Sequence, residues 1–114
     1  MPYGIRALFD TNRTEDAATI AAGLGAFVPV GAALDHPIRI MLVQNLTDIL
    51  LEFSLDGVNI HFVLPSGGFL LLDISSDNSP EQAFFISRGS RLYAAGLPAS
   101  GDAYFSAVYG LGDL

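Results

Sequence analysis

Turn-forming residues interrupt this chain about every 8–12 residues, and this spacing most limits the folds open to it. Short apolar runs lie between the interruptions from one end of the chain to the other. Such spacing is typical of antiparallel sandwiches and barrels. The prolines fall at the edges of runs or in turns, where strands tolerate them. We therefore expect an all-β fold, a single antiparallel β-sandwich or jelly-roll-like domain with an extended N-terminal arm.

The individual runs predict where the strands lie. Two turn signals stand out between them, Asp56-Gly57, which favours a hairpin, and Pro65-Ser66-Gly67-Gly68. A loop is expected over residues 75–82. Extended segments are expected over residues 3–9, 27–30, 38–45, 49–55, 59–64, 69–74, 84–87, 92–95 and 103–109.

Two segments depart from simple alternation. Residues 69–74 are apolar at successive positions, which predicts burial on both faces, and in a small domain the second covering layer is often another subunit. Residues 14–22 stay open between two interpretations. Thr14 could cap a helix there, but Gly23 and Gly25 end the alanine-rich stretch so early that we favour extended chain.

The chain divides into two parts of unequal character. Residues 1–34, rich in alanine and glycine, are expected to form the N-terminal arm and first short strands, and residues 35–114 the β-sandwich domain. We expect the arm or the adjoining loops to contact a neighbouring subunit in an assembly.

The charge balance excludes several classes of partner. The 114 residues carry 12 acids against five bases, all of them arginine, for a net charge of −7. Nucleic-acid binding needs clustered cations that displace counterions from phosphates, and anionic membrane surfaces need them too. We therefore expect neither nucleic-acid nor membrane partners. The absence of cysteine removes thiol chemistry and cysteine-ligated metals.

The ends of the chain and its longest uncharged run argue for synthesis in a cytoplasm. The amino terminus has no basic start followed by a long apolar stretch, as a signal peptide would. Residues 17–34 are uncharged, but several glycines and Pro29 interrupt them, which makes a poor transmembrane helix.

Catalytic candidates are few. His36 follows Asp35, but neighbouring side chains in extended chain point apart, so we expect an exposed loop histidine. His61 lies between two apolar residues and is expected to face solvent or an interface. A serine on a Gly-x-Ser-x-Gly turn is missing from the sequence. We expect no enzyme, no catalytic residues and no cofactor.

The remaining polar motifs favour structural roles. Asp48, Glu52 and Asp56 could bind a cation or act as a carboxylate pair, but a solvated sheet face explains them more simply. Asp73 and Asp77 flank a turn without an EF-hand ligand series, and no metal site is expected. Other candidates with a simpler structural explanation are the glycine-rich Ser66-Gly67-Gly68, the glycosylation sequon Asn45-Leu46-Thr47, and the aromatic residues Tyr93, Tyr104 and Tyr109, expected in core or interface positions.

A series of turn and strand signatures from Pro37 onward resembles small virion structural proteins of tailed bacteriophages. The signatures carry no catalytic content, and the resemblance brings over no catalytic or ligand residues. They are Pro37-Ile38-Arg39-Ile40, Gln44-Asn45-Leu46-Thr47-Asp48, Phe53-Ser54-Leu55-Asp56-Gly57, Pro65-Ser66-Gly67-Gly68-Phe69, Leu72-Asp73-Ile74, Ala103-Tyr104-Phe105-Ser106 and Tyr109-Gly110.

The resemblance implies an all-β component of a phage particle, made in the host bacterial cytoplasm and located in the virion. We expect a capsid cement or decoration protein, forming a homo-oligomer, that binds and stabilises the shell of the major capsid protein or other virion structural proteins. Two alternatives remain, a neck, collar or tail-accessory subunit of the virion, and a carbohydrate-binding β-sandwich module, since a fold does not determine a function.

Overall fold

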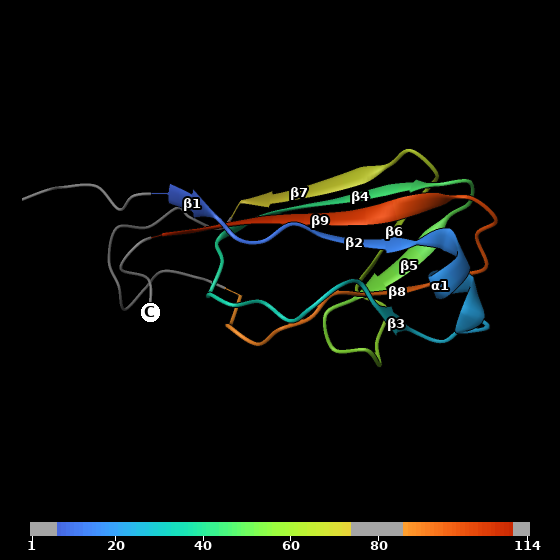
Figure 1. The fold of residues 1–114 in the computed structure, drawn as a ribbon, viewed down its shortest axis with the longest axis horizontal. Helices are drawn as coiled ribbons and strands as arrows, with labels where there is room; N and C mark the ends of the chain where they lie inside the picture. The colour runs from blue at the N-terminus through green and yellow to red at the C-terminus, as the bar shows by residue number, and fades with distance from the viewer. Residues whose placement is uncertain (1–6, 74–85, 111–114) are drawn as a thin grey trace, which may run out of the picture.

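The computed structural model describes residues 7–73 and 86–110, which form two antiparallel sheets packed together (Figure 1). The five strands of the first sheet are β1 (Ala7–Phe9), β2 (Arg13–Asp16), β4 (Ile40–Thr47), β7 (Phe69–Asp73) and β9 (Gly101–Gly110). The four strands of the second are β3 (Val28–Pro29), β5 (Leu51–Ser54), β6 (Phe62–Leu64) and β8 (Tyr93–Ala95). The helix α1 (Ala17–Ala22) lies at one end of the sandwich. The expected all-β sandwich is confirmed.

The long strand β9 organises the first sheet. Both β1 and β2 pair with one of its sides and β4 pairs with the other, while β7 pairs with the far side of β4 and forms the edge. In the second sheet the order is β3-β8-β5-β6, with β6 at an edge. The Asp56-Gly57 signal lies in the loop that joins β5 to β6, so the predicted hairpin is confirmed.

The core fills the space between the two sheets. The alternation of β4 places every second side chain inward, so that Met41 and Val43 are buried while their neighbours are not. The second sheet contributes the fully buried Leu51 and Phe53, and α1 closes one end of the core with Ile20. Burial of apolar surface at about 25 cal/mol per Å² is the main favourable term holding such sheets together.

The described residues 7–34, expected as the N-terminal arm and first short strands, contain short strands, and these belong to the sandwich and not to an extended arm. Pairing of β1 and β2 with β9 accounts for the first part of this segment. Three apolar side chains farther along, Ile20, Val30 and Leu34, lie in the core. Alanine and glycine content suggested an arm, but these widely spaced apolar residues pack inward. The boundary expected between residues 34 and 35 therefore separates two parts of one sandwich.

The ambiguous segment 14–22 contains both of the structures considered for it. The chain is extended in β2 up to Asp16, and α1 begins at Ala17. The cap is Asp16 rather than Thr14, because its Oδ1 accepts a hydrogen bond from the Thr19 N–H at 2.9 Å.

Most other predicted strands are present with shifted ends. Only residues 86 and 87 of the segment expected over 84–87 are described, and Ile86 forms an isolated β-bridge with Ile38. The described chain itself covers only one face of β7, since Phe69 and Leu71 are 65% and 59% exposed, and cover of the other face by another subunit stays a prediction. Leu70 and Leu72 do pack against the core. Residues 75–82 and Asp77 lie outside the described residues.

Among residues 7–73 and 86–110, helices of the length and apolarity needed to cross a bilayer are absent.

Candidate interaction surface

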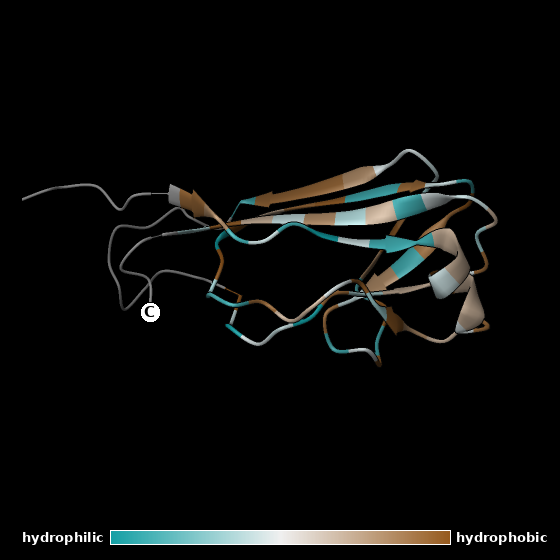
Figure 2. Ribbon diagram, viewed as in Figure 1, coloured by the Kyte–Doolittle hydropathy of each residue, from teal (hydrophilic) through white to brown (hydrophobic). Residues whose placement is uncertain are grey.

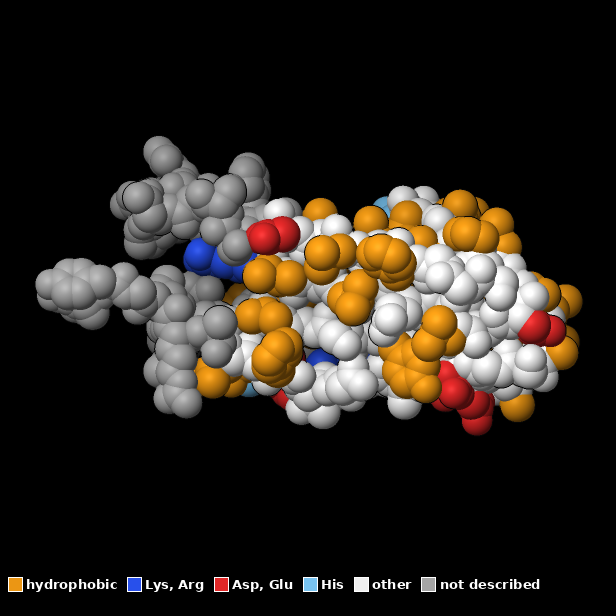
Figure 3. Space-filling view, turned by 90° about the horizontal axis from the view of Figure 1, so that it is seen from above, with side chains coloured by type: hydrophobic (Ala, Val, Ile, Leu, Met, Phe, Trp, Pro, Cys, Tyr) orange, Lys and Arg blue, Asp and Glu red, His pale blue; other side chains and the backbone are white. Residues whose placement is uncertain are grey.

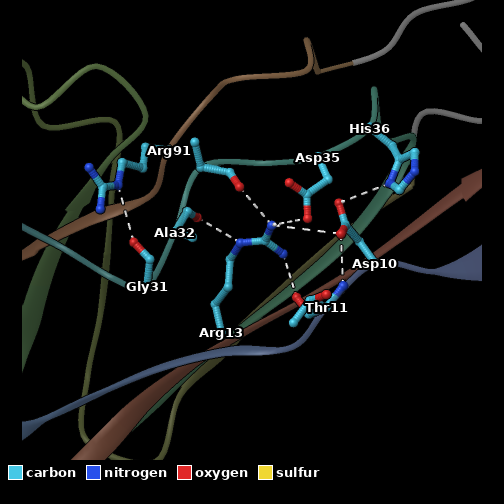
Figure 4. A network of polar contacts seen from close by, with 9 residues as sticks. Asp10, Thr11, Arg13, Gly31, Ala32, Asp35, His36 and Arg91 are labelled. Carbon is cyan, nitrogen blue, oxygen red and sulfur yellow. Dashed lines mark hydrogen bonds and ion pairs between the residues drawn. The ribbon is translucent and has the colours of Figure 1, made fainter.

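A buried arginine holds the loop after β3 against β2 (Figure 4). The guanidinium of Arg13 donates hydrogen bonds to the carbonyl oxygens of Ala32 at 2.7 Å and Ala33 at 2.8 Å, and to that of Thr11. Its side chain is 3% exposed. Counted with the other arginines, Arg13 looked like a scattered surface cation. In the structure its charged group is buried and binds backbone carbonyl oxygens.

Asp10 and His36 meet beside this arginine. The Asp10 carboxylate, 1% exposed, has Oδ1 3.6 Å from Nη2 of Arg13 and Oδ2 3.7 Å from Nδ1 of His36. The imidazole stacks on the ring of Tyr109 with 3.7 Å between centroids. His36 was expected to be an exposed loop residue, and it is partly exposed, but its acidic neighbour is Asp10 and not Asp35. The cluster anchors loops, because Arg13 binds the carbonyl oxygens of Ala32 and Ala33 and Asp10 accepts a hydrogen bond from the Thr11 N–H at 2.7 Å.

The second histidine closes the loop between β5 and β6. Nδ1 of His61 accepts a hydrogen bond from the Leu55 N–H at 2.9 Å, and its Nε2 lies 3.7 Å from Oδ2 of Asp56. Hydrogen bonds from the backbone N–H groups of Asn59 and Val58, and then from side chains, hold the pKa of Asp56 well below its ordinary value of 3.8. Asp56 lies beyond the end of β5, so it organises the loop instead of sharing a sheet face with Glu52 as expected.

Asn45 of the predicted sequon is fully buried. Its Nδ2 donates to the carbonyl oxygens of Ile49 at 2.9 Å, Leu64 at 2.8 Å and Pro65 at 3.2 Å. Its Oδ1 accepts from the N–H and the hydroxyl of Thr47 at 3.0 and 2.6 Å. The amide therefore ties both sheets to the turn at residues 65–68. It is not accessible for glycosylation in the folded chain.

The other polar candidates also serve local structure. Asp48 accepts hydrogen bonds from the Ala99 and Ser100 N–H groups, and the first of these is the main cause of its lowered pKa. Ser66 donates to the carbonyl oxygen of Thr47 at 2.6 Å within the predicted turn. No cluster of three or more metal-ligating side chains occurs in the described part of the chain.

The three tyrosines occupy separate places. Tyr104 lies on the outer face of the first sheet, where its hydroxyl is 3.3 Å from Asp102, while Tyr109 stacks on His36. Tyr93 belongs to the second sheet and lies over Gly57. All three are partly buried, and they do not share one flat platform of the kind that a sugar ring stacks on.

Apolar side chains gather instead on the outward side of the first sheet. Its register pairs outward residues across the strands, for example Leu71 with Leu42 and Phe69 with Gln44. Figure 2 shows that β7 is hydrophobic along most of its length, and Figure 3 shows hydrophobic side chains spread over this side of the molecule. We call this surface the outer face; its apolar members are Phe9, Ile40, Leu42, Leu46, Phe69, Leu71, Tyr104 and Val108.

The outer face mixes its apolar side chains with the uncharged polar Thr14, Gln44 and Ser106, and it is acidic at its ends. Asp16 and Asp102 are paired at one end, and Asp73 stands beside Ile40 at the other. At the paired outward positions of the described strands there is no basic side chain. Phe9 is 82% exposed and Leu46 48% exposed. Exposed apolar side chains gathered on one face of a sheet are typical of an interaction site.

Comparisons with protein-family models, with curated proteins and with solved structures find no significant match for this chain.

Proposed function

We propose that this chain is a structural protein of a tailed-bacteriophage virion, a cement or decoration protein that binds the shell formed by the major capsid protein. The observation that carries the proposal is the outer face, where a β-sheet that would be half-solvated in a monomer presents apolar side chains along several strands. The turn and strand signatures that resemble virion proteins support the same class.

The places of the polar clusters and of the outer face support a role in docking. The polar clusters around Arg13, Asn45 and Asp56 each bind loops of the chain itself, and none is arranged around a space for a substrate. By contrast, no described segment of the chain covers the outer face. Burying its side chains against a shell would remove their apolar surface from water, the usual driving force of association.

Mass-spectrometric copy number in purified virions tests this proposal. We expect the chain in a fixed ratio to the major capsid protein, with about one copy for each equivalent binding position on the shell. A copy number restricted to a single ring would assign the chain to the neck, collar or tail. Absence from purified particles would contradict the proposal, and glycan binding by the isolated chain would then favour the carbohydrate-binding alternative.

A further inference from the structure

The edge strand β7 presents a row of backbone groups that no other described strand pairs with. At its start the Asn45 N–H donates to the Gly68 carbonyl at 2.9 Å, while the Gly67 N–H donates to the Asn45 carbonyl at 2.8 Å. Gly67 has a φ of +80°, so these contacts form a glycine bulge that sets the register between β4 and β7.

That register determines which groups of β7 point away from β4. Hydrogen-bonded and non-hydrogen-bonded pairs alternate along an antiparallel ladder. Because residues 45 and 68 are a hydrogen-bonded pair, Leu70 bonds to β4, whereas the N–H and C=O groups of Phe69 and Leu71 point to the open side. No backbone hydrogen bond to a described residue occupies those groups of Phe69 and Leu71.

From Phe69 to Leu72 the strand carries no charge, proline or bulge of the kind that protects a sheet edge. Natural edge strands carry lysine, proline or bulges along their length to prevent pairing with other chains. The sequence of β7 is Phe-Leu-Leu-Leu-Asp, and its outward side chains Phe69 and Leu71 are largely exposed. An extended strand is therefore the partner that both the backbone and the side chains of this edge would accept.

We propose that a second copy of this chain pairs with β7, strand to strand and antiparallel, about a two-fold axis at Leu70. In this register Phe69 of each copy faces Leu71 of the other, and each such pair exchanges both of its backbone hydrogen bonds. The exposed aromatic and aliphatic side chains then cover each other on the outer face. The two five-stranded sheets become one continuous sheet with a continuous outer face.

The self-matching register and the local charge favour a second copy as the occupant. Two chains of net charge −7 repel, but the paired segment from Phe69 to Leu71 is uncharged, and Asp73 would face Gly67 of the other copy, not a second carboxylate.

Sedimentation of the full chain over a concentration series tests the pairing, which does not depend on a capsid being the larger partner. We expect wild type to dimerise. Leu71→Pro removes an N–H that points away from β4, so the fold should be retained while dimerisation weakens by at least about tenfold. The control is Leu24→Asn, which removes an exposed apolar side chain outside the strand, keeps the net charge and suits the φ of +54°, and it should dimerise as wild type.

Cross-linking tests the register itself. The chain has no cysteine, so Phe69→Cys and Leu71→Cys chains carry one thiol each. We expect an oxidised mixture of the two variants to form a disulfide-linked dimer several-fold faster than either variant alone, because residues 69 and 71 face each other across the axis. A monomeric wild type, an undiminished Leu71→Pro dimer, or equal rates in the mixed and separate samples would each overturn the proposal.

Discussion

Single buried polar residues decide where the loops of this sandwich attach. Asn45 is the clearest case, because one amide binds the carbonyl oxygens of Ile49, Leu64 and Pro65 and accepts two hydrogen bonds from Thr47. A buried polar group that loses its hydrogen-bond partner destabilises the fold, because no hydrogen bond then offsets the free energy of its desolvation. The stability of the region therefore depends on this amide far more than on any exposed one.

Asn45→Ala should lower the free energy of unfolding by about 3 kcal/mol, since it leaves several buried carbonyl oxygens without donors. Asn12→Ala is the matched control, because that exposed amide accepts one hydrogen bond from Ser106, and its loss should cost less than about 0.5 kcal/mol. Urea unfolding of both variants measures the difference. Equal effects would mean that the buried amide network contributes nothing special.

Residue identity alone could not reveal these roles. Asn45 stood out only as part of a sequon, and Arg13 only as one positive charge, because their partners are distant in sequence. Ala33 lies twenty residues from Arg13, and Leu64 nineteen from Asn45. A hint was present in the pattern of β4, where Asn45 falls on the same inward face as Met41 and Val43.

At the scale of elements, the sequence pattern predicted the positions of the strands well, but it did not predict which of their faces are covered. Alternation located β4, β5 and β9, and the turn signals located the loops between β5, β6 and β7. The pattern of β7 could not tell which face the chain itself covers, because an apolar run reads the same whether its outer side is covered by the chain, by another subunit or left open. Residues 14–22 stayed open between helix and extended chain because Asp16 ends a strand and caps a helix at once.

The loop between β5 and β6 should be sensitive to acid. The pKa of Asp56 is lower in the folded chain than its ordinary 3.8, so the ionised carboxylate stabilises the fold above that pH. This stabilisation is lost as the pH falls from about 4 toward the depressed folded value. Thermal unfolding from pH 6 to pH 2 should show a shallower loss of stability for Asp56→Asn than for wild type. Parallel curves would show that this carboxylate does not couple the loop to pH.

The turn into β9 requires glycine for a steric reason. Gly101 has a φ of +92°, and an added Cβ would lie 2.0 Å from the carbonyl oxygen of Leu46. Gly25 has a similar φ of +90° but open space around it. Gly25→Ala should cost about 1 kcal/mol from backbone strain alone, and Gly101→Ala about 3 kcal/mol or more, as measured by urea unfolding. Equal losses would mean that the strand pair relaxes around the new methyl group.

At the scale of the whole molecule, the chain combines a well-satisfied interior with an outward sheet surface that its described residues leave uncovered. The interior polar groups bind loops, and the net charge of −7 keeps most of the exterior repulsive to copies of itself. The outer face and the β7 edge are the places where apolar contact can overcome that repulsion. Lateral pairing through β7 would leave the outer face free to dock on a shell.

The most direct test of this account is the binding of the purified chain to phage particles that lack it, quantified by co-sedimentation. Phe9→Asp combined with Leu46→Asp places charges on the outer face away from β7, and Leu24→Asp combined with Leu97→Asp is a control of equal charge elsewhere on the surface. We expect wild type and the control to bind alike and the outer-face variant to bind at least about tenfold more weakly. Undiminished binding by a correctly folded outer-face variant, or no binding by wild type, would contradict the account.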